Sequence, residues 1–378
     1  MQEFQKETSI KIASRLLILV LIVLICYTLQ SIVVPILFAL ILSVLLLPIC
    51  ERLEKWGVGR AFASIISLIF AILIVLGIAY LVVSQTLTIS QDTSEILNKI
   101  QSLLKSMLDW ASDQFHVSSA EIMSRVEKEL GNSFSTMGQF ISTGLNSIGS
   151  SLTYFILIPV MIFFFLYYRE FFKEFFFRIF VSKPKKEIEE VIRKIYDVLR
   201  NYLVGLITVM GIVAILNTIG LTILGIEHAV FFGVLAAMLT IFPYVGIFIG
   251  SLIPALFALA TKDSAWYAGG VILWFQLVQT LEGNFITPKI VGGKASLNPL
   301  VSLLSFFLGG MLFGILGMIL ALPILAMLKV IFDALPETSA YGFLLSEPND
   351  SYILSEQQKK RKMEKQKRAE QKKKKESE

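Results

Sequence analysis

The chain has 378 residues, of which 55% are hydrophobic and 17% are charged, and its mean hydropathy is +0.72. Soluble domains average about 45–50% apolar and about 25% charged residues, so this composition excludes an ordinary soluble domain and favours a lipid bilayer as the solvent. The net charge of +5 does not indicate a nucleic-acid partner, because residues 351–378 hold 11 basic and 5 acidic residues and residues 1–350 carry −1. Cys26 and Cys50 lie in or beside apolar runs and offer neither a disulfide framework nor a metal-ligand spacing.

A helix needs roughly 20 residues to cross a bilayer, and eight apolar stretches approach or exceed this length. They are residues 16–29, 32–49, 61–83, 152–168, 202–224, 229–260, 265–281 and 299–332. The sequence therefore predicts an all-α integral membrane protein with about eight transmembrane helices. The stretch 229–260 is too long for a straight crossing and contains Pro243 and Pro254, so we expect either one bent span or a re-entrant pair.

The distribution of basic residues predicts the orientation of the spans. Residues 84–150 contain four basic and seven acidic residues and are expected outside the cytoplasm, whereas residues 169–200 contain nine basic residues and are expected inside. Both termini then lie in the cytoplasm, although Lys289 and Lys294 would lie outside, against the rule. The predicted units are a three-span segment 1–83, an extracytoplasmic segment 84–150, a five-span segment 151–335 and a Lys-rich cytoplasmic tail 336–378.

Two segments have the pattern of amphipathic helices that lie on a surface. Residues 92–111 carry apolar side chains on one helical face, and residues 170–200 begin with five phenylalanines among basic residues. We expect 170–200 to be a cytoplasmic helix in the membrane interface. Packing against neighbouring helices is the alternative for both. The Lys-rich tail either lies against anionic lipid or is a solvated spacer.

No catalytic constellation is present in the sequence. His116 and His228 are not at a metal-ligand spacing, and no nucleophile is accompanied by a base. Residues 292–295 resemble part of a phosphate-binding loop, but Pro288 replaces its first glycine and Ala295 its Ser or Thr. We therefore expect no enzyme activity, cofactor or metal.

Polar residues at membrane depth are the better candidates for function, because a charged group there is costly. Glu282 ends the run 265–281 and is followed by Asn284 and Pro288, so we expect the helix to break there. Gln279 shares its helical face. The alternative is that Glu282 lies among lipid headgroups and pairs with Lys289.

Glycine and proline also interrupt two other apolar segments, as in transporters with discontinuous helices. Pro243 is followed by Gly246 and Gly250, which form a small-residue face, and the last stretch contains Gly310 and Gly314. Ordinary close helix packing is the alternative for these glycines. Asn217 and Lys329 are weaker candidates, and Lys329 is expected to extend to the cytoplasmic surface.

The C-terminal half contains four distinctive blocks, residues 242–246 (FPYVG), 281–292 (LEGNFITPKIVG), 297–300 (LNPL) and 309–317 (GGMLFGILG). Together, in this order, they resemble the autoinducer-2 exporter family of permeases. The resemblance extends to about residue 333 and implies an oligomeric inner-membrane permease that lacks an ATPase domain. It leaves the substrate open, since members are linked both to export of signalling molecules and to sodium/proton exchange. The Lys-rich tail is not part of the resemblance.

These observations predict a secondary transporter that exports a small solute, for example an autoinducer-2-like signalling molecule. A sodium/proton antiporter and a membrane scaffold that holds partners are the alternatives. The expected partners are a small molecule or ion, membrane lipid and further copies of the chain, without nucleic acid. The candidate pathway residues are Gln279, Glu282, Asn284, Pro288, Pro243, Gly246, Gly250, Asn298, Gly310 and Gly314.

Overall fold

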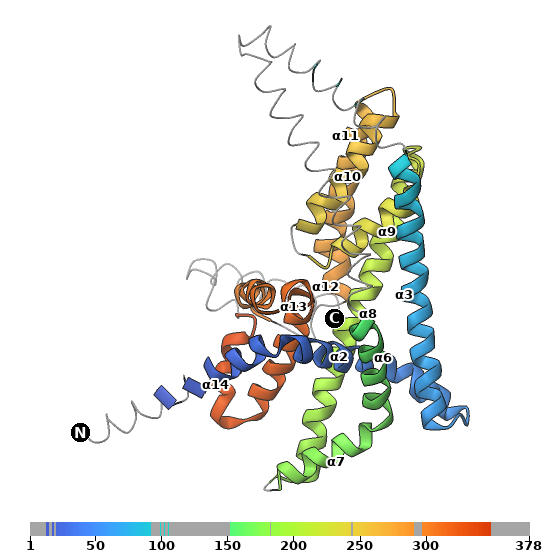
Figure 1. The fold of residues 1–378 in the computed structure, drawn as a ribbon. Coiled ribbons are helices and arrows are strands. Elements are labelled where there is room, and N and C mark those ends of the chain that lie inside the picture. Colours follow the sequence, from blue (N-terminus) through green and yellow to red (C-terminus); the bar gives the residue numbers. More distant parts are fainter. Residues whose placement is uncertain are drawn as a thin grey trace, which may run out of the picture.

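The computed structural model describes residues 13–14, 17–18, 20–91, 99, 102, 105, 152–181, 183–242, 245–290 and 297–348. Within these ranges the protein is built from helices and contains no β-strand, which confirms the all-helical fold (Figure 1). Four helices in the described part have the length and composition to cross a membrane: α2 (Gln30–Lys55), α3 (Arg60–Gln91), α8 (Lys185–Ile223) and, if its two arms on either side of Gly314 are counted together, α13 (Pro299–Ala334). A fifth span results if α6 (Leu152–Tyr167) and α7 (Arg169–Ile179), which meet at 68°, are counted together. The predicted number of eight is therefore not confirmed.

The N-terminal helices α2, α3 and α6 pack side by side around small residues. Ala39 and Ala63 are fully buried, together with Cys50, and these short side chains allow the helices to approach closely. At the end of α2, the carboxylate of Glu54 accepts two hydrogen bonds from Arg169, at 2.9 and 2.5 Å, and Arg60 lies 3.8 Å away. This ion pair joins the turn between α2 and α3 to the bend between α6 and α7.

The segment expected to be one amphipathic helix over 170–200 is divided between two helices. Helix α7 ends at Ile179, the chain turns, and α8 begins at Lys185 and continues without a break to Ile223. The ion pair between Lys173 and Glu189, 2.6 Å long, joins the two helices. Pro184 precedes the first residue of α8 and accounts for the new start, because a residue without an amide hydrogen is tolerated at a helix N-terminus but not inside.

Residues 229–260 form a pair of antiparallel helices rather than one bent span. Helix α9 (Ala229–Leu239) is followed, after a break, by α10 (Val245–Thr261), and neither is long enough to cross a bilayer. Near the break, Gly250 lies against Ala236, and at the open end the rings of Phe232 and Phe257 are 5.1 Å apart. The pair also packs on α8 and α11 (Trp266–Leu281), and the four helices enclose a core of buried aromatic and small residues.

The last apolar stretch, expected to be a single span over 299–332, is folded back on itself. Gly314 has φ 62° and ψ −147°, a conformation that only glycine adopts without strain, and it reverses the direction of α13. The backbones of Gly309 and Gly317 meet across the two arms, and the side chain of Met318 covers Gly310. The arms of α13 therefore form a second helical hairpin, and α14 (Ser339–Leu345) packs beside it.

Candidate functional site

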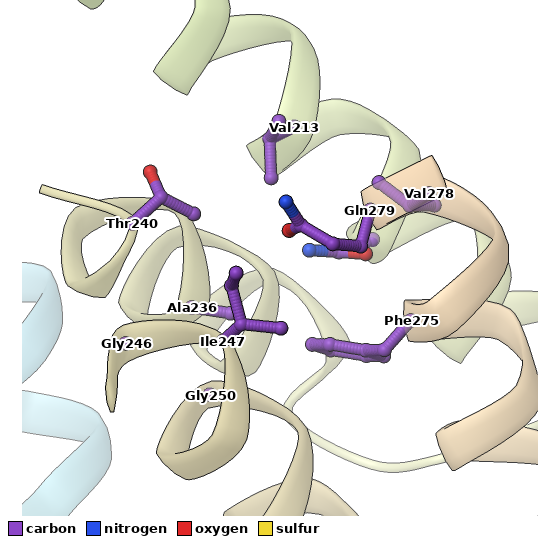
Figure 2. A pocket seen from close by; sticks show the side chains of 10 residues that line it. Val213, Ala236, Thr240, Gly246, Ile247, Gly250, Phe275, Val278 and Gln279 are labelled. Atoms are coloured by element: carbon purple, nitrogen blue, oxygen red, sulfur yellow. The ribbon is translucent and has the colours of Figure 1, made fainter. Parts of the chain in front are cut away.

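A small cavity lies where α8, α9, α10 and α11 meet (Figure 2). Its volume of about 20 Å³ is enough for a single water molecule. Most of the wall is apolar, and its polar groups are the side chains of Asn217, Thr240 and Gln279. The lining residues are Val213, Asn217, Ala236, Thr240, Gly246, Ile247, Gly250, Phe275, Val278 and Gln279.

Asn217, on α8, is the most unusual residue of this cavity. The residue is only 3% exposed, and its Oδ1 atom has no hydrogen-bond partner among the residues that the structure describes. A buried acceptor left without a partner costs about 1–3 kcal/mol. An arrangement of this kind is expected where a water molecule or a ligand supplies the missing donor.

Glu282 is connected to this cavity through Gln279. The Nε2 group of Gln279 donates a 2.7 Å hydrogen bond to one carboxylate oxygen of Glu282, and the hydroxyl of Thr287 donates to the other. In Figure 2, the side chain of Gln279 extends from α11 towards Val213 on α8. A chain of polar groups therefore runs from the cavity wall to a carboxylate whose hydrogen-bond partners are neutral. The alternative pairing of Glu282 with Lys289 does not occur in the described structure.

The expected helix break after Glu282 is not present. The helix continues from α11 through a π-helical turn, η1 (Glu282–Ile286), into α12 (Thr287–Ile290). The backbone N–H of Thr287 donates to the carbonyl of Glu282, and the side chain of Asn284 donates to the carbonyl of Thr280 at 2.9 Å. The wider turn and the Asn284 side chain satisfy backbone groups that a break would have left free. Such π-bulges are frequent at functional sites.

The structure brings some of the predicted residues together and leaves others apart. Gly246 and Gly250 line the cavity, because without side chains they let α10 approach the backbone of α9. Asn284 and Pro288 are exposed on the continuation of α11. Pro243 lies outside the described residues, in the break between α9 and α10.

The remaining three predicted residues lie elsewhere. Asn298 caps the start of α13 by accepting the N–H of Leu300 at 3.0 Å, and its own N–H donates to the carbonyl of Leu345. Gly310 and Gly314 belong to the hairpin of α13 and do not line this cavity. Sequence reasoning omitted Thr240, whose only signal was its place three residues before Pro243.

Within the part of the chain that the structure describes, no group of three or more His, Cys, Asp or Glu side chains could hold a metal ion. The site consists of amides, hydroxyls and one carboxylate at the edge of an apolar wall. Such groups can bind a polar solute or exchange a proton.

Comparison with known proteins agrees with this chemistry. The family model described as "AI-2E family transporter" matches residues 16–337. "Putative permease PerM" of Escherichia coli (strain K12) is 26% identical over 324 residues, which cover 83% of this chain and 90% of the relative. "Putative transport protein YueF" of Bacillus subtilis (strain 168) is 27% identical over 261 residues, covering 67% of this chain and 69% of the relative. With the family model matching most of its length, the chain belongs to the AI-2E family of transporters.

Proposed function

We propose that the protein is a secondary transporter that moves a small polar solute past the cavity between α8 and α11. The observation that carries this proposal is the buried, unpaired Oδ1 atom of Asn217. Asn217 lines a water-sized space near the break between two short helices, and a solute that enters this space could donate a hydrogen bond to its Oδ1 atom.

Glu282 supplies a protonation site that can be coupled to the solute. As a carboxylate it accepts from both Gln279 and Thr287. A protonated Glu282 becomes a donor at one oxygen, so either Gln279 must turn its amide to offer Oε1 or Thr287 must give up its hydrogen bond. Because Gln279 also lines the cavity, a turn of its amide changes whether the cavity wall presents a donor or an acceptor.

The solute class follows from the lining and from the family name. Amide and hydroxyl groups in an apolar wall suit a small uncharged molecule with several hydroxyl or carbonyl groups. An autoinducer-2-like signalling molecule has this chemistry, and export across the inner membrane is the direction that we propose. The transporter is proposed to act as a homo-oligomer.

Charge placement supports an orientation with both termini in the cytoplasm. Lys55, the last residue of α2, and Arg60, the first residue of α3, flank the turn between these helices, and Glu54 links this turn to Arg169 at the start of α7. Both regions lie at the same end of the molecule in Figure 1, opposite the turn between α10 and α11. A single basic face is what a cytoplasmic side requires.

Transport by the purified full chain in proteoliposomes tests the proposal. With autoinducer-2 inside the vesicles and a proton gradient across them, Glu282→Gln should lower the flux at least tenfold and remove its dependence on pH. Glu227→Gln is the matched control, because Glu227 is exposed in the turn before α9 and should behave as wild type. Equal flux and pH dependence in wild type and Glu282→Gln would contradict the proposed coupling. Sodium-driven proton flux without solute flux would favour an antiporter instead.

A further inference from the structure

A second, larger cavity lies on the other side of the break between α9 and α10. Its volume is about 130 Å³, and it is lined by α8, the end of α9 and both arms of the α13 hairpin. Its lining residues are Tyr202, Leu206, Thr240, Ile241, Phe306, Met318, Ile319 and Leu322. Thr240 lines this cavity and the smaller one, so the two spaces are neighbours across the break.

The lining indicates which molecules this cavity can hold. None of its side chains is charged, and burying an unpaired charge there would be strongly unfavourable. An engineered apolar cavity of about 150 Å³ binds benzene, so a space of about 130 Å³ has nearly the size of a six-membered ring. The cavity therefore selects small, uncharged and largely apolar molecules.

Two hydroxyl groups add a polar requirement. The hydroxyl of Thr240 donates to the carbonyl of Ala237 at 2.7 Å, which leaves its oxygen able to accept a hydrogen bond. The hydroxyl of Tyr202 has no hydrogen-bond partner among the described residues and can donate or accept. An occupant with one hydroxyl or carbonyl group would satisfy a group that the protein leaves unpaired.

We infer that this chamber, between α8 and the α13 hairpin, binds a small uncharged molecule of about the size of a six-membered ring that carries one hydroxyl or carbonyl group. The chamber is formed only because the α13 hairpin folds back at Gly314 and places Phe306 and Met318 on adjoining walls. Whether the occupant is also the transported solute rests on the proposed function, whereas binding itself does not.

Phenol and benzene are the probes for this site, because they share a ring and differ by one hydroxyl. Thermal unfolding of the full chain in detergent should show a saturable rise in midpoint with either compound. Leu322→Phe fills the chamber and should abolish both shifts. Leu328→Phe, on the same arm of α13 but outside the chamber, should retain them. The same shift in wild type and Leu322→Phe, or no saturable shift in wild type, would overturn the inference.

Tyr202→Phe keeps the shape of the chamber and removes its unpaired hydroxyl, so the test does not depend on Leu322→Phe folding. Losing one hydrogen bond of about 1 kcal/mol should raise the phenol concentration needed for half the shift about fivefold and leave benzene unchanged. Equal weakening for both probes, or for neither, would contradict the role of Tyr202. The assay contains no transport step, so unchanged transport in Glu282→Gln would refute the proposed coupling without affecting this result.

Discussion

The N-terminal helices and the C-terminal hairpins differ in whether their buried polar groups have hydrogen-bond partners. Among α2, α3 and α6, buried Ser64 and Ser67 donate to carbonyls one turn earlier in their own helix, and Glu54 is paired with Arg169. Between α8 and α11, the buried Asn217 has an oxygen without a partner beside a cavity. The first region has its polar groups satisfied internally, whereas the second leaves one to be satisfied by something else.

The two regions also differ in helix length. Helices α2 and α3 have 26 and 32 residues and no break, while α9 and α10 have 11 and 17 residues. Short paired helices place backbone ends and turns inside the protein, where they can line a polar site. Under the proposed function, the N-terminal helices are the scaffold and the C-terminal hairpins carry the solute.

The largest expected difference between the regions comes from the same substitution made in each. A Cβ atom at Gly246 would overlap the backbone carbonyl of Leu239, whereas one at Gly77, on α3, would have no atom within 4 Å. Gly246→Ala should therefore lower the free energy of unfolding by about 3 kcal/mol, because the two backbones must separate. Gly77→Ala should be neutral or raise it by up to about 1 kcal/mol. Unfolding in mixed micelles, followed by circular dichroism, measures both, and equal effects would show that the α9–α10 contact is not tight.

Hydropathy and composition are enough to predict the helical membrane fold, because the length and polarity of a span are encoded locally. They are not enough to predict the number of spans. The apolar run 299–332 predicts one span, but these residues form a hairpin because the backbone angles of Gly314 reverse the chain. The sequence does not reveal this reversal, because glycine also occurs in straight helices. The π-turn at Glu282 was missed for a similar reason. Glycine, asparagine and proline favour a break, but the side chain of Asn284 restores a backbone hydrogen bond.

The candidate site was predictable in part. Gln279 and Glu282 are three residues apart on one helix, so their contact follows from the helical repeat. The meeting of Gln279 with Asn217, Gly246 and Gly250 depends on how three other helices pack, which is a long-range property. Asn217 carried a signal, a lone amide in an apolar span, but its significance comes from its missing partner, and only the packing reveals that.

A smaller loss of stability is expected at the ion pair that closes the N-terminal scaffold. Arg169 and Glu54 are partly buried and share two hydrogen bonds, so Arg169→Met should lower the free energy of unfolding by about 1–2 kcal/mol. Arg178→Met is the control, because Arg178 is 80% exposed and its ion pair with Glu174 should contribute at most a few tenths of a kcal/mol. If this region is only scaffold, solute flux per folded Arg169→Met molecule should equal that of wild type. A lower solute flux in Arg169→Met, at an unchanged folded fraction, would contradict the division of the molecule into a scaffold and a part that carries the solute.

The smallest expected change in stability has the opposite sign and distinguishes the two regions most directly. Asn217→Leu removes the unpaired oxygen and replaces it with an apolar side chain, so the free energy of unfolding should rise by about 1 kcal/mol. Ser67→Ala, in the scaffold, removes a satisfied hydroxyl and should lower it by about 0.5–1 kcal/mol. Solute flux should fall at least tenfold in Asn217→Leu and stay unchanged in Ser67→Ala, because only the first change removes an acceptor from the proposed path. If Asn217→Leu is more stable but transports less, the unpaired amide of Asn217 serves solute binding even though it lowers the free energy of unfolding. If Asn217→Leu instead has the flux of wild type, the unpaired oxygen of Asn217 is a packing defect and the solute path lies elsewhere.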